Sequence, residues 1–220
     1  MAYSTCEVRE VGAETSVDDP LEIPVHLKPD VGSMAIQLRS TVSRVCVGAG
    51  LARRTQLLDE LRAASSLPLS TSPAGGTVVV TGPGVLGISA IGVPPPESAF
   101  SLDWGLRTLA GWLAPALATF DIDDYQIGKI EGAWCPGFSD IAIGGRKLIG
   151  LGFRVTREWV ALRGVMPVLP YSSEELAALA SCHRLIGLDI DEDKVTSLQQ
   201  CTPQTVDVDE VISRWRDVVS

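Results

Sequence analysis

Four stretches of the chain carry apolar residues at the spacing of amphipathic helices. In residues 55–66 and 101–120 leucines recur every three or four positions, and Pro68 follows the first of these stretches. Near the C-terminus, Ser172 with Glu175 has the pattern of a capping box ahead of residues 176–185. Asp207 and Glu210 in the same way precede residues 208–219. We therefore predict four helices at these positions.

The other apolar stretches are short and rich in β-branched residues, which favours strands. We expect buried strands over residues 36–49, 78–80, 85–93 and 159–168. The order of strands and helices along the chain predicts an α+β domain, with a mixed, largely antiparallel sheet and flanking helices.

Residues 141–153 are predicted to form a β-hairpin around Gly144-Gly145, since both residues of a tight two-residue turn adopt positive φ angles. Strict alternation after the turn would place Lys147 on one strand face with Ile149, Leu151 and Phe153. The opposite face would then carry Leu148, Gly150 and Gly152. Glycines on one face favour close approach by another backbone or by a ligand.

Composition and charge narrow the class of protein. With 220 residues, the chain is long enough for one domain, and we assign it to residues 36–220, with residues 1–35 as an N-terminal arm or edge strands. The net charge of −9 argues against a nucleic-acid partner. No apolar run is long enough to span a membrane and no signal region is visible, so we expect a cytoplasmic protein without a membrane partner.

Cysteine and histidine usage excludes several kinds of site. The five cysteines include no CxxC pair, which predicts reduced thiols and no metal site. The two histidines, His26 and His183, leave little for a Ser-His-Asp mechanism or a multi-histidine metal centre.

Two candidate chemical groups lie twelve positions apart. Cys135, in the turn sequence Trp-Cys-Pro-Gly, could be an exposed nucleophile near a cation or a small apolar filler. Lys147 could be a buried functional cation or a solvated hairpin residue. Two glycine-rich loops, residues 73–77 and 81–84, could hold an anion or an acyl chain with their N–H groups, or could be plain turns.

Together these segments resemble the catalytic domain of lipoate–protein ligases and of octanoyl and lipoyl transferases, a domain related to biotin ligases. Residues 74–86 resemble the transferase run that contains Gly-Gly and Gly-Pro-Gly, and residues 145–152 resemble the run around the family's essential lysine. The sequence Trp134-Cys135-Pro136-Gly137, with Asp140, resembles a transferase subgroup that uses a cysteine ahead of this hairpin. The chain departs from the family at residues 70–76, which contain no arginine, at Thr81 and at Arg163, where the transferases have histidine.

The resemblance implies a biotin/lipoate ligase-like fold and an acyl-transfer mechanism without a required cofactor. Cys135 would take an octanoyl or lipoyl group from an acyl donor as a thioester, while Lys147 donates hydrogen bonds to the acyl carbonyl. A lysine of a lipoyl carrier domain or a glycine-cleavage-type carrier protein would then attack. The implied acyl-binding residues are Ala74, Gly75, Gly76, Thr77, Thr81, Gly82, Gly84, Asp140, Gly150 and Gly152.

Two alternatives remain open at this point. One is an ATP-dependent ligase that works on lipoate or octanoate through an acyl-adenylate, with Asp140 helping to place Mg²⁺ and with or without a separate accessory subunit. The other is a non-catalytic relative that binds an acyl chain or a carrier.

The carrier would need a docking surface. Four arginines flank the proposed site in the sequence and are predicted to dock the carrier, although they could equally be solvated strand residues: Arg146, Arg154, Arg157 and Arg163.

Overall fold

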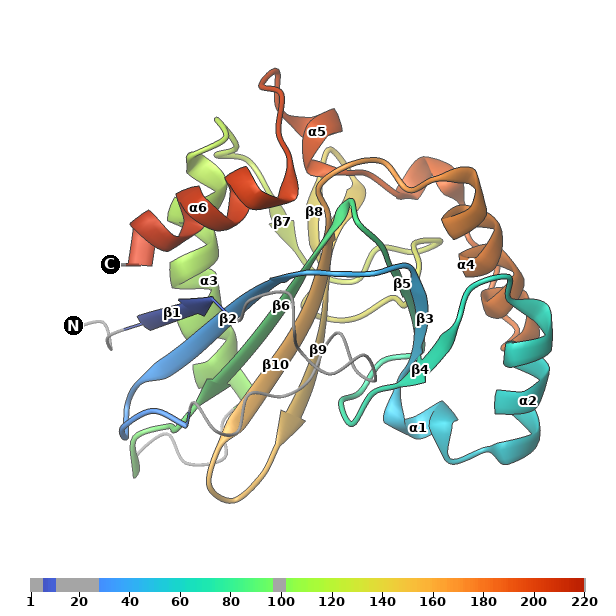
Figure 1. The fold of residues 1–220 in the computed structure, drawn as a ribbon. Coiled ribbons are helices and arrows are strands. Elements are labelled where there is room, and N and C mark those ends of the chain that lie inside the picture. The colour runs from blue at the N-terminus through green and yellow to red at the C-terminus, as the bar shows by residue number, and fades with distance from the viewer. Residues whose placement is uncertain (1–5, 11–27, 97–101, 220) are drawn as a thin grey trace.

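The computed structural model describes residues 6–10, 28–96 and 102–219, so most of the predicted N-terminal arm lies outside the described residues. The main sheet contains β1 (Cys6–Glu10), β2 (Met34–Ser40), β6 (Val85–Gly92), β7 (Gln126–Ile127), β8 (Ile141–Ile143), β9 (Arg146–Val155) and β10 (Val160–Pro167). Its strand order is β1-β2-β6-β10-β9-β8-β7, and every neighbouring pair is antiparallel except β1 with β2 (Figure 1). The mixed, largely antiparallel sheet predicted from the sequence is confirmed.

A second, smaller sheet lies beside the main one. It has the order β4-β3-β5 and contains β3 (Arg44–Val47), β4 (Leu69–Thr71) and β5 (Val78–Thr81). The predicted single strand over residues 36–49 is therefore wrong, because β2 and β3 belong to different sheets. Thr41 marks the break: its hydroxyl donates to the carbonyls of Gly82 and Val85, at 2.8 and 2.9 Å. No glycine or proline signals this break in residues 40–44.

Helices flank the two sheets, in agreement with the predicted flanking helices. They are α1 (Ala49–Ala52), α2 (Thr55–Ala64), α3 (Leu102–Ala118), α4 (Ser173–Leu185), α5 (Leu198–Cys201) and α6 (Val208–Val219), with a short 3₁₀ helix, η3 (Glu192–Lys194). Both predicted caps form, since the Ser172 hydroxyl accepts from the N–H of Glu175 and Asp207 accepts from the N–H of Glu210. None of the described helices is long and apolar enough to cross a membrane.

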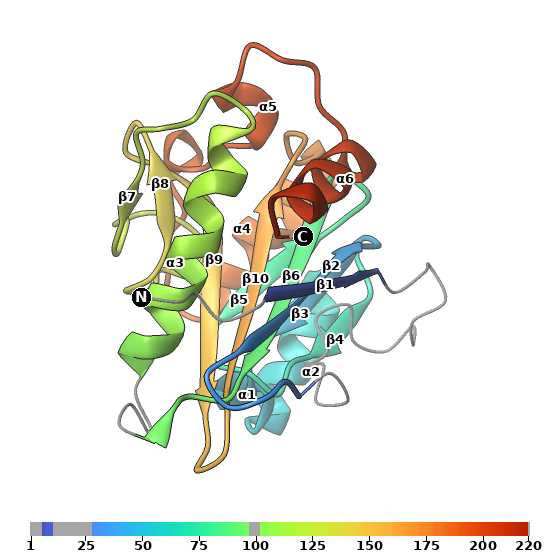
Figure 2. The same ribbon diagram turned by 90° about the vertical axis from the view of Figure 1, so that its left-hand side faces the viewer.

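Two apolar cores lie on the two faces of the main sheet. Helices α3 and α6 cover one face, where Leu113, Phe120 and Trp215 are buried against the strands (Figure 2). The small sheet, with α2 and α4, forms the other side of the molecule (Figure 1). There the second core includes Val80, Val165 and Trp134, which the loop before β8 supplies.

The predicted hairpin forms, but with an irregularity that changes which way the lysine faces. Gly144 and Gly145 have φ angles of 56° and 73°, as a tight turn requires. Across β8 and β9, Ile141 pairs with Ile149 whereas the next residue, Ala142, pairs with Lys147, so β9 contains one extra residue at this point. This β-bulge reverses the alternation of side chains.

The predicted face for Lys147 is therefore wrong. A Cβ on Gly150 would lie 2.9 Å from Lys147 Cε, which places this lysine on the glycine face of β9 and away from Leu151 and Phe153. That face looks toward the small sheet, where a Cβ on Gly152 would meet the carbonyl of Gly75 at 2.8 Å.

Candidate active site

A pocket lies where the glycine face of β9 meets the small sheet and the loop before β8. With its open mouth it contains about 460 Å³ of empty space. Its lining is mostly apolar or glycine: Cys46, Gly48, Ser72, Ala74, Gly75, Gly76, Thr77, Val79, Trp134, Cys135, Gly150, Leu151, Gly152, Arg163, Gly164 and Val165. The pocket thus combines a candidate nucleophile with space for an apolar chain.

Glycines keep this pocket open. Gly76 has a φ angle of 108°, and a Cβ there would lie 3.2 Å from Cys135 Sγ. A Cβ on Gly150 would lie 2.4 Å from the ring of Trp134. Both positions require the absence of a side chain, and for Gly150 this confirms the close approach predicted from the sequence.

Six of the predicted acyl-binding residues line this pocket and four do not. The six are Ala74, Gly75, Gly76, Thr77, Gly150 and Gly152. Among the others, the Thr81 hydroxyl donates to the carbonyl of Val42 at 2.7 Å, and Gly82 packs against Glu175. Gly84 packs against Leu169. Thr81, Gly82 and Gly84 therefore contact other parts of the protein and not the pocket, and we withdraw them as acyl-binding candidates.

Cys135 is half-buried, and its backbone is held in an unusual conformation. Its φ angle is 41°, in the left-handed region that costs a residue with a side chain about 1–3 kcal/mol. The following Pro136 further restricts it, because the ordinary helical conformation is disfavoured before proline. The Thr77 backbone N–H donates to Cys135 Sγ at 3.0 Å, which holds the sulfur beside the glycine loop. The thiol is therefore directed at the glycine loop by a conformation that other contacts must maintain.

Lys147 is fully buried directly beneath this cysteine. Its ammonium donates to the Trp134 carbonyl, to the Cys135 carbonyl and to Asp140 Oδ2, all at 2.8 Å. It also lies 4.0 Å from the centroid of the Trp134 ring. Burial lowers the pKa of Lys147, while the charge of Asp140 and, more weakly, that of Cys135 raise it. The solvated-lysine alternative is excluded by this burial.

The predicted contact of Lys147 with an acyl carbonyl is not available in this arrangement. An ammonium has three N–H donors, and the three acceptors just named use all of them. Lys147 instead fixes the carbonyls of two consecutive residues, Trp134 and Cys135, and places a positive charge near the thiol. A hydrogen bond to substrate would require it to release one of these partners.

Asp140 extends this network beneath the cysteine and does not line the pocket. It is 0% exposed, and Oδ2 accepts from the Gly137 N–H at 2.8 Å in addition to Lys147. Burial raises the pKa of Asp140, and the neighbouring Lys147 opposes that shift. The predicted acyl contact of Asp140 is therefore wrong, because this carboxylate binds Lys147 and the turn that follows Cys135.

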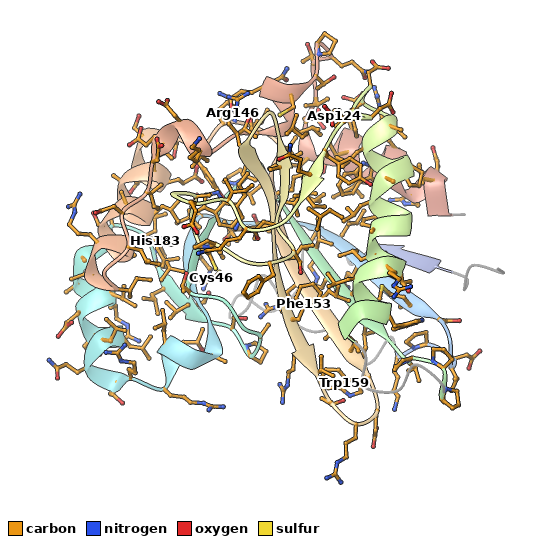
Figure 3. All side chains as sticks on the ribbon, turned by 180° about the vertical axis from the view of Figure 1, so that it is seen from behind. Cys46, Asp124, Arg146, Phe153, Trp159 and His183 are labelled. Atoms are coloured by element: carbon orange, nitrogen blue, oxygen red, sulfur yellow. The ribbon has the colours of Figure 1, made fainter. Side chains whose placement is uncertain are left out.

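His183 was missed in the sequence, which offered no motif around it. It is fully buried on α4, and Figure 3 shows it on the helix beside the small sheet. Its Nδ1 lies 2.9 Å from the Leu179 carbonyl, and its Nε2 accepts from the Cys135 backbone N–H at 3.1 Å. A carbonyl can only accept and an amide N–H can only donate, so this ring is neutral with its proton on Nδ1.

Burial lowers the pKa of His183, the Leu179 carbonyl opposes this shift, and the charge of Lys147 adds to it. The ordinary value in an unfolded chain is 6.5, so below that pH the unfolded state takes up a proton that the folded site resists. The stability that His183 contributes is thus present above pH 6.5 and is lost as the pH falls through the lowered folded-state value.

We expect this loss to appear in a comparison with His183→Gln, which has no titrating ring. As the pH falls below 6.5, the free energy of unfolding should decrease more for the unmodified protein, by at most about 1.4 kcal/mol per pH unit. Urea unfolding of both proteins between pH 8 and pH 4.5 measures the difference between their free energies of unfolding. The contribution of the acidic groups is the same in both proteins and cancels in this difference. Parallel curves would show that His183 does not titrate as the geometry requires.

The four arginines predicted to dock a carrier do not form one surface. Arg163 is only 3% exposed, lines the pocket and donates to the Ser72 hydroxyl, so it cannot belong to an exposed patch. Arg146 begins β9, whereas Arg154 lies eight residues later, about 26 Å along an extended strand. Arg154 lies over the ring of Trp159. Figure 3 shows Arg146 and Trp159 near opposite ends of β9.

Comparisons with known proteins identify the family of this chain. The family model described as the lipoyl protein ligase A/B catalytic domain matches residues 37–220. An octanoyl-[GcvH]:protein N-octanoyltransferase from Geobacillus kaustophilus is 34% identical over 90 residues, which cover 41% of this chain and 31% of that protein. An octanoyltransferase from Gloeobacter violaceus is 30% identical over 121 residues, covering 54% of this chain and 49% of that protein. The chain thus matches less than half the length of these relatives.

Solved structures share the fold at low sequence identity. A lipoate-protein ligase A bound with ATP is similar with a TM-score of 0.61 and 15% identity, covering 84% of this chain and 71% of the other. The bipartite lipoate protein ligase of Thermoplasma acidophilum is similar with a TM-score of 0.57 and 14% identity, covering 84% and 69%.

Proposed function

This chain belongs to the family of lipoyl protein ligase A/B catalytic domains, and on that premise we propose that it is an acyltransferase that carries an octanoyl or lipoyl group on Cys135. The acceptor is a lysine of a lipoyl carrier domain or of a glycine-cleavage-type carrier protein. The observation that carries this proposal is the position of the thiol: Cys135 Sγ lines an apolar pocket and accepts a hydrogen bond from the Thr77 N–H.

The first step transfers the acyl group to the enzyme. The Cys135 thiolate attacks the carbonyl carbon of an acyl thioester, a new C–S bond forms, and the donor's thiolate leaves. Lys147 binds the backbone carbonyl of the attacking cysteine, and the apolar pocket wall holds the acyl chain.

The second step transfers the acyl group to the acceptor. A neutral lysine amine attacks the Cys135 thioester, the amide bond forms, and the C–S bond breaks. The Cys135 thiolate is regenerated, and the proton lost by the amine is released or retained on the thiol. No net oxidation or reduction takes place, so neither step needs an oxidant or a reductant.

Two observations favour this reaction over the ATP-dependent ligase. The ligase alternative assigned Mg²⁺ placement to Asp140, but this carboxylate is 0% exposed and already binds Lys147 and Gly137. Residues 70–76, which border the pocket, also contain no arginine to bind an adenylate phosphate. The arginine that does line the pocket, Arg163, already donates to the Ser72 hydroxyl.

Mass spectrometry of the intact protein separates the possibilities. Incubation with an octanoyl thioester, with and without ATP and Mg²⁺, should give an octanoyl adduct on Cys135 without nucleotide, and a lipoyl carrier domain should then remove it. Product only with ATP would establish the ligase alternative. Neither adduct nor product would leave a non-catalytic binding protein.

We infer that an exposed aromatic residue close to Cys135 in the chain contacts the acceptor. Phe138 is 90% exposed at the tip of a turn closed by the Asp140 N–H and the Gly137 carbonyl, at 3.4 Å. The turn is anchored to Lys147 through Asp140, so Phe138 projects from a fixed base three residues after the thiol. Exposed aromatic residues on rigid supports are typical anchors of protein interfaces.

We expect Phe138→Ala to slow octanoyl transfer to the carrier domain about tenfold, because an aromatic anchor contributes roughly 1.4 kcal/mol or more. Acylation of Cys135 by a small thioester should not change. Val31→Ala is the matched control, since Val31 is 63% exposed and lies next to β2 and β6, away from β8. Equal carrier kinetics in both variants would remove Phe138 from the interface.

A further inference from the structure

The conformation of Cys135 raises the question of what maintains it. A left-handed φ angle of 41° at a residue with a side chain, placed before proline, persists only where surrounding contacts over-determine it. Both backbone polar groups of Cys135 are bound by side chains from distant segments. Its carbonyl accepts from Lys147 on β9, and its N–H donates to His183 on α4.

We propose that His183 is a positioning residue whose neutral imidazole holds Cys135 in this left-handed conformation, so that the thiol stays directed at the Thr77 N–H and the pocket. The role deepens the acyl transfer proposed above and rests on it. His183 does not touch the thiol, since its ring nitrogen binds the backbone of Cys135.

The helix fixes the ring in the state that this role requires. Leu179 lies one turn before His183 on α4, and its carbonyl accepts the Nδ1 proton at 2.9 Å. That bond leaves Nε2 as an acceptor aimed at the Cys135 N–H. Cys182 and Leu179 are fully buried around this segment of α4, so the ring cannot turn toward water without opening the helix from the second core.

The hydrogen bond between His183 and Cys135 also determines which N–H groups of the site are free to bind the substrate. Because the Cys135 N–H is used by His183 and all three Lys147 donors are used, none of these groups is free to bind the carbonyl oxygen of an incoming thioester. The Thr77 N–H faces the reacting sulfur and becomes available once that sulfur is acylated. A fixed cysteine is what keeps the sulfur and this N–H together.

Two variants of similar size separate positioning from packing. Gln at position 183 keeps an acceptor at about the place of Nε2, whereas Leu fills the space without one. Amide hydrogen exchange at Cys135 in the complete protein measures the contact without reference to activity. Single-turnover acylation by an octanoyl thioester, followed by intact mass, gives a rate at saturation and an apparent dissociation constant. Alkylation of Cys182, which is fully buried beside His183, reports any opening of α4.

We expect His183→Leu to expose the Cys135 amide to exchange at least tenfold faster and to reduce the saturated acylation rate about tenfold, with thioester binding and Cys182 protection unchanged. For His183→Gln, both the exchange rate of the Cys135 amide and the saturated acylation rate should stay within about threefold of the values for the unmodified protein. Unchanged amide protection in His183→Leu overturns the proposal. So does equal loss in both variants together with alkylation of Cys182, which indicates packing alone. Absence of any acylation in the unmodified protein would overturn the proposed function, and amide exchange would then decide the role of His183 by itself.

Discussion

Replacement of Cys135 by serine is expected to abolish the octanoyl adduct and to lower carrier octanoylation by a factor on the order of 10³ or more. A hydroxyl is far less acidic than a thiol, so serine supplies almost no anionic nucleophile at neutral pH. The melting temperature should change little, because the side chain is half-buried and serine can accept the same hydrogen bond from the Thr77 N–H. Intact-mass analysis and thermal unfolding of the same preparation test both parts.

Full activity of Cys135→Ser would favour an adenylate route, and a large loss of melting temperature would mark Cys135 as a packing residue. The strained φ angle adds a second check. Cys135→Gly should be more stable than Cys135→Ala by about 0.5–1 kcal/mol, because glycine adopts the left-handed region without the steric cost of a Cβ. A reversed order would mean that this conformation is not maintained in solution.

Replacement of Lys147 by methionine is expected to cost both activity and stability. The structure buries this lysine completely against Asp140. Its removal leaves a buried carboxylate without its counter-charge, which costs about 3–5 kcal/mol. The carbonyls of Trp134 and Cys135 also lose their donor, so we expect acylation to fall about 10²-fold or more.

The double variant Lys147→Met/Asp140→Asn separates these two effects. Asparagine removes the unpaired charge and can still accept from the Gly137 N–H, so most of the stability should return while activity does not. In the single variant the pKa of Asp140 stays raised without Lys147 to oppose it, so its stability should increase as the pH falls and the carboxyl takes up a proton. Activity that returns together with stability would show that Lys147 acts only through the fold.

Local sequence signals determined most elements of this protein. Apolar periodicity placed α2, α3, α4 and α6, and the polar caps at Ser172 and Asp207 fixed where two of them begin. Gly144-Gly145 determined the hairpin turn, because few other residues accept positive φ angles at both positions. These features depend on neighbours in the chain, so they can be derived without the fold.

Other features were decided only by the tertiary structure, because they depend on contacts between segments that are distant in the sequence. The β-bulge in β9 reversed the direction of Lys147, since pairing with β8 and not the alternation within β9 fixes its side. The break between β2 and β3 depends on Thr41 bonding to residues 82 and 85. The separation of the arginines depends on strand length and burial. His183, 48 positions from Cys135, carries no local motif because its role exists only where α4 packs against the loop that holds the thiol.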